Sequence, residues 1–193
     1  MNHPKVRFTV ILFCALLVAC SKSTEDDAAG NTIEQLERRL ELRHHEELLT
    51  RMAAPGTTLA TFTTDGCSGG LSVGWEYLAG HIAAIQKQHG IRPAWEPCCI
   101  EHDRRYHTGP ENGATLEESF AARKQADQAL QACVIETGHT RAAELSLEYG
   151  VSPESVDTLY AAIAELMYRA VRVGGMPCSG LPWRWGYGWP ECG

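Results

Sequence analysis

The chain has 193 residues, with 17 Lys and Arg against 24 Asp and Glu and a formal net charge of −7. An acidic chain lacks the positive potential that nucleic acid binding requires, so we expect no nucleic acid partner. The same charge gives little general attraction to an anionic membrane surface.

The N-terminus has the pattern of an export signal. Two basic residues precede an apolar run over residues 8–19, which is shorter than the roughly 20 residues of a membrane-spanning helix. The four residues that end at Cys20 read Leu-Val-Ala-Cys and resemble a bacterial lipobox. We therefore expect residues 1–19 to be removed as a signal peptide and Cys20 to carry acyl chains that anchor the protein to a membrane. An ordinary signal peptide cleaved near Ala19 is the alternative.

Processing after residue 19 would leave 174 residues, with 15 Lys and Arg against 24 Asp and Glu and a net charge of −9. That length suits one domain with its own core, located in the bacterial cell envelope (the outer membrane first) or outside the cell. Residues 20–31 are small, polar and acidic, which predicts a flexible linker. Six cysteines would remain, and in an exported chain they imply three disulfides with fifteen possible pairings. They are Cys67, Cys98, Cys99, Cys133, Cys178 and Cys192.

Residues 32–54 are highly charged and predict an amphipathic helix. Glu34 and Arg38, like Glu47 and Arg51, are four residues apart with the acid first, the favourable order on a helix. We expect this helix to pack on its own domain, and binding of a partner is the alternative.

A loop and two helices follow in chain order. Residues 61–70 form a glycine-rich loop, and apolar residues at helical spacing predict a helix over 75–89. Pro97 suits the first position of the next helix, which residues 107–110 break.

Two later helices complete a mainly α domain without a convincing strand. Thr115 with Glu118 is a capping-box pattern and predicts a helix that runs to about Val134. Pro153 begins the last helix, which ends at Gly174 and Gly175. Its expected apolar stripe comprises Val156, Leu159, Ile163, Leu166, Met167 and Ala170.

The helix after Pro97 groups polar side chains by its periodicity. Residues four apart share a face, which places His102 between Cys98 and Tyr106. The adjacent Asp103 points about 100° away from His102. One of the two side chains can therefore face a substrate water while the other faces a cation.

Residues 98–106 read Cys-Cys-Ile-Glu-His-Asp-Arg-Arg-Tyr and resemble the Cys-Cys-x-x-His-Asp signature of the secreted phospholipase A2 superfamily. Residues 64–70 resemble the calcium loop of its bacterial and fungal forms, and Asp127 precedes Cys133 at the spacing of the family's buried aspartate. The resemblance covers roughly residues 61–134. It implies disulfide-linked antiparallel catalytic helices with extra helices, in a catalytic domain over 55–177.

The same resemblance implies calcium-dependent hydrolysis of the sn-2 acyl ester of glycerophospholipids at a membrane surface. His102 would act as the general base on water, Asp127 would bind its other ring nitrogen, and Tyr106 would bind Asp127. The implied calcium ligands are the Asp103 carboxylate and backbone carbonyls of the preceding loop. Best placed in that loop are Gly66, Ser68 and Gly70.

The resemblance also implies three disulfides. Cys67 would pair with Cys99 and Cys98 with Cys133, which leaves Cys178 and Cys192 for each other. The last pair would close an aromatic loop over residues 178–193.

Some assignments stay open in the sequence. The family's second tyrosine donor to the aspartate has no obvious counterpart, and Tyr160 and Tyr168 are the candidates. Asp127 lies on the apolar face of its helix, where burial would require hydrogen bonds; the alternative is that it points to solvent. The tryptophans and the tyrosine of 182–190 either dock at a membrane interface or pack over the core.

Two other functions compete with hydrolysis as explanations of these residues. Zinc binding by Cys98, Cys99 and His102 is disfavoured, because adjacent helical cysteines cannot both reach one ion comfortably. A catalytically silent lipoprotein that binds lipid or a partner is the second alternative. The oligomeric state is left open.

Overall fold

The computed structural model describes residues 35–36, 38–67 and 93–192. The chain divides into two compact units, Met1–Leu40 and Glu41–Gly193. The described residues of the first unit are helical, and the second unit contains every feature discussed below. The expected signal peptide, Cys20, the linker and the helix at 75–89 lie outside the described residues.

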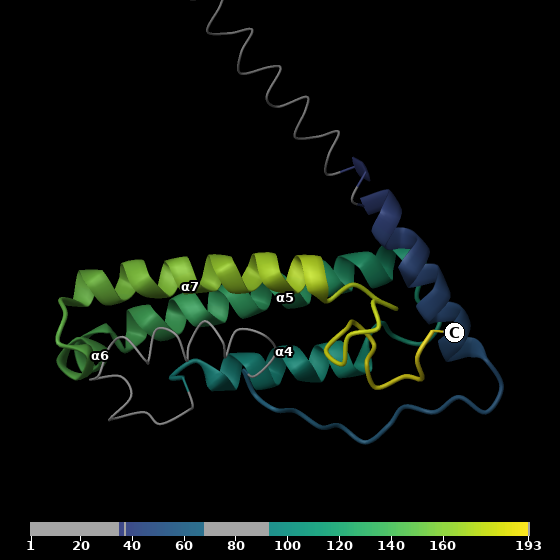
Figure 1. Ribbon diagram of the computed structural model, residues 1–193, viewed down its shortest axis with the longest axis horizontal. Helices are drawn as coiled ribbons and strands as arrows, with labels where there is room; N and C mark the ends of the chain where they lie inside the picture. The colour runs from purple at the N-terminus through teal and green to yellow at the C-terminus, as the bar shows by residue number, and fades with distance from the viewer. Residues whose placement is uncertain (1–34, 37, 68–92, 193) are drawn as a thin grey trace, which may run out of the picture. The chain divides into compact units, whose positions relative to one another are not determined.

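The second unit is built from helices. Residues 41–53 are helical, and among the described residues there is no β-strand, so the prediction of a mainly α fold is confirmed. No described helix combines the length and apolar character needed to cross a bilayer. Figure 1 shows α5 and α7 lying along each other, with α6 at one end and α4 against α5. The bounds are α4 Glu96–Thr108, α5 Leu116–Thr140, α6 Ala142–Tyr149 and α7 Pro153–Gly174.

The predicted start of α5 is correct. The Thr115 hydroxyl accepts a hydrogen bond from the Glu118 amide at 3.2 Å, and the Glu118 carboxylate accepts one from the Thr115 amide at 2.7 Å. The predicted end near Val134 is wrong, because α5 continues to Thr140. Gly138 lies directly against the ring of Tyr160. This close approach lets α5 stay packed along α7 beyond the point where its apolar pattern fades.

The buried face of α7 differs from the predicted stripe. Val156 and Met167 are buried as expected, but Leu166 is 63% exposed and Ala170 is exposed as well. Tyr160 and Ala164 are fully buried in their place. The buried face of α7 is rotated relative to the predicted stripe because Tyr160 lies at its centre. Tyr160 has a mostly apolar ring, although its hydroxyl makes it look polar in the sequence.

The helix at 41–53 packs on its own domain, as expected. Leu48 is 1% exposed and belongs to a core cluster with Tyr106, Ala126 and Trp185. This contact joins the helix to α4, to α5 and to the C-terminal tail.

The C-terminal tail closes the end of α4. Backbone amides of Gly186 and Gly188 donate to the carbonyl oxygens of Tyr106 and His107 at 2.6 and 3.1 Å. These carbonyls belong to the last turn of the helix, where no partner exists within the helix itself. Trp185 is 2% exposed and packs edge-on against Tyr106 with ring centroids 5.2 Å apart. For Trp185, packing over the core is therefore the correct alternative.

Candidate active site

Disulfides hold the start of α4 from two sides. One ties the loop at residues 61–67 to α4, and another ties α4 to α5. The zinc alternative is wrong, because the sulfur atoms of Cys98 and Cys99 are bonded to other sulfurs. The pairs, which are those that the resemblance implies, are Cys67–Cys99, Cys98–Cys133 and Cys178–Cys192.

His102, Asp127 and Tyr106 meet in the space between α4 and α5. The His102 Nε2 atom lies 2.9 Å from Asp127 Oδ1, and the Tyr106 hydroxyl donates to the same oxygen at 2.6 Å. Asp127 is completely buried, so the alternative in which it points to solvent is wrong. Burial raises the pKa of Tyr106 well above its ordinary value, which keeps the phenol protonated as a donor.

The contact with Asp127 fixes the protonation of the imidazole. A carboxylate only accepts hydrogen bonds, so Nε2 of His102 carries the hydrogen. The neutral ring then presents Nδ1 as its unprotonated nitrogen. His102 is 7% exposed and lines a cavity, so Nδ1 is the atom available to accept a proton from a bound water.

Arg172 takes the place expected for a second tyrosine. Its Nη1 atom donates to Asp127 Oδ2 at 2.9 Å. The Tyr160 hydroxyl instead lies 3.0 Å from that of Tyr149. The expectation that Tyr160 or Tyr168 donates to Asp127 is therefore corrected. Among the described side chains, the donor to Asp127 Oδ2 is the guanidinium of Arg172.

Sequence reasoning also missed Arg123 and Glu41. Arg123 is completely buried and Glu41 is 4% exposed, and they form an ion pair with each other. A signal was present for Arg123, which lies one helical turn before Asp127 on the same face of α5. Glu41 belongs to a different helix, and no spacing rule connects it to either residue.

The loop before α4 meets Asp103 through a hydroxyl. Thr64 donates to Asp103 Oδ2 at 2.5 Å and accepts from the Gly66 amide at 3.0 Å. Burial raises the pKa of Asp103, while the Thr64 hydrogen bond opposes the rise. Gly66 has a φ of 73°, and a Cβ there would meet Glu96 Oε1 at 2.7 Å. Only glycine fits this approach without strain.

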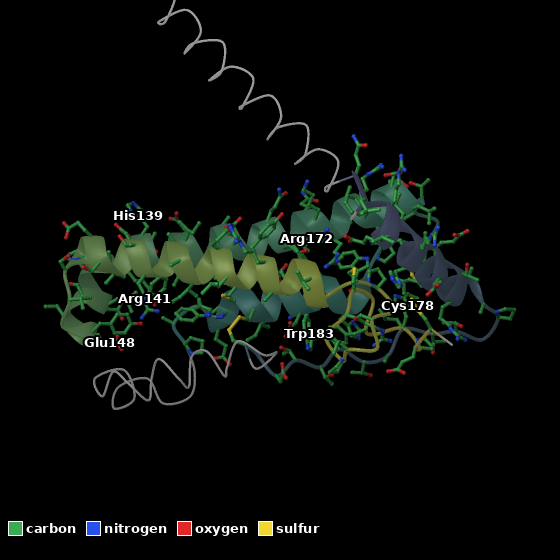
Figure 2. The ribbon with its side chains drawn as sticks, turned by 45° about the horizontal axis from the view of Figure 1, so that its top comes forward. His139, Arg141, Glu148, Arg172, Cys178 and Trp183 are labelled. Carbon is green, nitrogen blue, oxygen red and sulfur yellow. A yellow bond between two sulfur atoms is a disulfide. The ribbon has the colours of Figure 1, made fainter. Side chains whose placement is uncertain are left out.

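One cavity joins these parts. Its lining includes the polar side chains of Asp65, His102 and Asp103 and the apolar side chains of Leu130, Met167 and Trp183. Figure 2 shows Trp183 and Arg172 away from the end of the bundle where Arg141 and Glu148 lie. A cavity lined by both polar and apolar side chains matches a ligand that carries a polar group beside a hydrocarbon chain.

The oxygen atoms of this cavity suit a hard cation. Asp103 and Asp65 offer carboxylates, and Gly66, which has only backbone atoms to offer, lines the same cavity. Calcium prefers oxygen ligands of these kinds. Ser68 and Gly70, the other expected ligands, lie outside the described residues. A second cluster of potential ligands among the described residues comprises Glu47, Cys178 and Cys192. Its two sulfurs form a disulfide, so they are not available as thiolate ligands.

Comparisons with protein-family models, with curated proteins and with solved structures give no match to this chain.

Proposed function

We propose that this protein is a calcium-dependent hydrolase of the phospholipase A2 type, which cleaves the sn-2 acyl ester of glycerophospholipids and releases a fatty acid and a lysophospholipid. The observation that carries the proposal is the His102–Asp127 hydrogen bond of 2.9 Å. It leaves Nδ1 of the imidazole unprotonated in a cavity that is also lined by Asp103 and by apolar side chains.

The order of contacts between α4 and α5 supports the same proposal. Cys98 of α4 pairs with Cys133 of α5, and His102, four residues later on α4, pairs with Asp127, six residues earlier on α5. Two helices with this order run antiparallel, as the resemblance to phospholipase A2 implies for its catalytic pair. We therefore propose α4 and α5 as the catalytic helices.

In the proposed mechanism, His102 acts as a general base. Its Nδ1 atom removes a proton from a water whose oxygen attacks the ester carbonyl carbon. The positive charge that develops on the imidazole is stabilised by the Asp127 carboxylate, and Tyr106 holds that carboxylate in place. The proton then passes from Nδ1 to the leaving alkoxide oxygen of the lysophospholipid, and no covalent acyl-enzyme forms. A positioned base of this kind contributes typically 10²–10⁴-fold to the rate.

The proposed calcium ligands are Asp103 and the backbone of Gly66, with Ser68 and Gly70 from the same loop. When bound, calcium supplies Lewis-acid polarisation of the ester carbonyl. Thr64 orients the Asp103 carboxylate, and the Cys67–Cys99 disulfide holds the loop against α4. In the proposed setting, acyl chains on Cys20 keep the protein at a membrane surface near its substrate.

The test is release of fatty acid from vesicles of a phosphatidylcholine with different acyl chains at sn-1 and sn-2. The full chain is assayed in millimolar calcium and in EGTA, and the lyso-product is identified by mass spectrometry. We expect sn-2 cleavage that requires calcium and is lost in His102→Gln and Asp103→Asn.

Matched controls lie on the same two helices. His139→Gln changes a histidine of α5 that is 73% exposed, and Glu101→Gln changes the neighbour of His102, which is 57% exposed. Both variants should keep wild-type activity. If His102→Gln hydrolyses as fast as wild type, the mechanism is wrong. If wild-type protein releases no fatty acid, the alternative of a lipid- or partner-binding lipoprotein replaces this proposal.

A further inference from the structure

Five side chains, four of them buried and one, Arg172, 19% exposed, form a closed ring of hydrogen bonds that includes Asp127. Arg172 donates to Asp127 Oδ2 at 2.9 Å and to Glu41 Oε2 at 2.6 Å. Arg123 donates to Glu41 Oε1 and to the Tyr106 hydroxyl, the latter at 3.1 Å. Tyr106 closes the ring by donating to Asp127 Oδ1. We call these five residues the charge ring.

The charge ring connects separate elements of the fold. Glu41 comes from the helix at 41–53, whereas the other members come from α4, α5 and α7. Arg123 also donates to the backbone carbonyl oxygens of Val171 and Arg172, at 2.7 and 2.8 Å. It therefore fixes the end of α7 that carries the Arg172 side chain.

The charges of the ring balance. Two carboxylates face two guanidinium groups, and an uncompensated buried charge would be strongly destabilising. Burial alone would raise the pKa of Glu41, but the hydrogen bond from His45 and the charges of Arg123 and Arg172 lower it to about 2. Glu41 is thus the second anion of the ring at neutral pH.

Glu41 holds Arg172 in a geometry that leaves Asp127 Oδ1 for His102. Arg172 divides its two Nη atoms between two carboxylates, one on each side. An arginine that lacks one of these partners can bind the other carboxylate with both Nη atoms, the preferred fork geometry. Without Glu41, Arg172 would therefore compete with His102 for Oδ1 of Asp127.

The orientation of Glu41 is itself fixed. His45 Nε2 lies 3.2 Å from Glu41 Oε1, and its Nδ1 lies 2.6 Å from the Ser119 hydroxyl. The Ser119 hydroxyl oxygen accepts from the Trp185 indole N–H at 3.3 Å. Glu41, His45 and Ser119 share the residue types of a hydrolytic triad. Ser119 and His45 have no exposed surface, however, so a substrate cannot reach them, and their role is support.

We propose that Glu41 is a positioning residue for His102, acting through Arg172 and Asp127. The helix at 41–53 thereby contributes a residue to the active site. This inference rests on the proposed hydrolase function. Displacement of a reacting group by about 1 Å can cost on the order of a hundredfold in rate. We therefore expect Glu41→Gln to lower kcat for fatty-acid release on the order of a hundredfold, with KM unchanged.

The control is Glu47→Gln, which changes a carboxylate on the same helix that is 59% exposed and should leave kcat and KM as in wild type. Glu41→Asp keeps the charge and should lie between wild type and Glu41→Gln, with kcat lowered about tenfold. A folded Glu41→Gln variant with wild-type kcat overturns the inference. If Glu41→Gln does not fold, Glu41→Asp decides, and a wild-type kcat for it has the same consequence.

A second readout does not depend on hydrolysis. The His102 Nε2 proton, hydrogen-bonded to a carboxylate, gives a low-field proton resonance that is assigned by its absence in His102→Gln. We expect Glu41→Gln, or Glu41→Asp where the first does not fold, to shift or broaden this resonance, and Glu47→Gln to leave it unchanged. An unchanged resonance in the Glu41 variant overturns the positioning role. If wild-type protein proves inactive, the proposed function fails while this measurement still tests how Glu41 positions His102.

Discussion

Arg172 binds the oxygen of Asp127 that His102 does not use. Its Nη1 atom lies 2.9 Å from Oδ2, and His102 Nε2 lies 2.9 Å from Oδ1. The carboxylate is therefore held between a permanent cation on one side and the imidazole on the other. A guanidinium carries donors in a rigid planar fork, so Arg172 occupies Oδ2 and leaves Oδ1 to His102 and Tyr106.

Removal of Arg172 tests this arrangement. Arg172→Gln leaves one oxygen of a buried carboxylate without its ion pair, and breaking such a pair typically costs about 3 kcal/mol or more in the free energy of unfolding. Urea unfolding at neutral pH measures the change. Arg169→Gln is the matched control on α7, because Arg169 is 73% exposed and surface pairs contribute at most about 1 kcal/mol. Equal losses for the two variants would contradict a structural role for the Arg172–Asp127 pair.

Glu41 predicts a pH dependence of stability. Its pKa is lowered from 4.5 to about 2 in the folded protein. Its contribution to stability is therefore complete above the unfolded value of 4.5 and is lost as pH falls toward 2. The shift corresponds to a contribution on the order of 3 kcal/mol.

The measurement is the free energy of unfolding in urea at a series of pH values from neutral down through this window. The difference between wild type and Glu41→Gln isolates Glu41 from the other carboxylates. We expect the wild-type advantage to shrink as the pH falls below 4.5. Parallel pH curves for the two proteins would show that Glu41 does not carry this dependence.

The sequence was sufficient for the parts of the site that lie within one helix or at a fixed spacing. The periodicity of α4 placed His102 and Tyr106 on one face, and the apolar face of α5 correctly implied that Asp127 is buried. The capping pattern at Thr115 located the start of α5, since a cap depends on neighbouring residues alone.

The sequence was insufficient where distant side chains meet. Glu41 and Arg172 are separated by 131 residues, and nothing in the local pattern of either helix specifies that they pair. The expected second tyrosine is absent from the described contacts of Asp127, because the guanidinium of Arg172 binds Oδ2 instead. The exposed Leu166 shows a related failure, since apolar periodicity could not reveal that Tyr160 occupies the centre of the buried face.

The Thr64 hydroxyl should affect calcium binding. It donates to Asp103 Oδ2 at 2.5 Å, and partners that orient a metal-binding carboxylate typically contribute about 10- to 100-fold to affinity. We expect Thr64→Val to weaken calcium binding at least about tenfold, measured by calorimetry. Thr61→Val is the control, because Thr61 is exposed in the same segment. Equal calcium affinities for both variants would argue against Asp103 as a ligand oriented by Thr64.

The C-terminal disulfide should stabilise the end of α4. Cys178 and Cys192 are separated by 14 residues, and closing a loop of this length contributes about 3 kcal/mol in the chain-entropy model. The loop also supplies the amides of Gly186 and Gly188 to carbonyl oxygens of the last turn of α4. We therefore expect the double variant Cys178→Ser, Cys192→Ser to unfold at lower urea concentration.

Hydrogen exchange separates this stabilisation from a purely unfolded-state effect. If the disulfide holds the tail on α4, the amides of Gly186 and Gly188 exchange faster in the double variant. The exchange rates of amides in the middle of α5 then change only as much as the change in global stability requires. If the disulfide acts through the unfolded chain alone, all these amides change together, because each then exchanges through global unfolding. Preferential loss of protection at Gly186 and Gly188 would place the tail among the elements that hold Tyr106, and through it Asp127, in position.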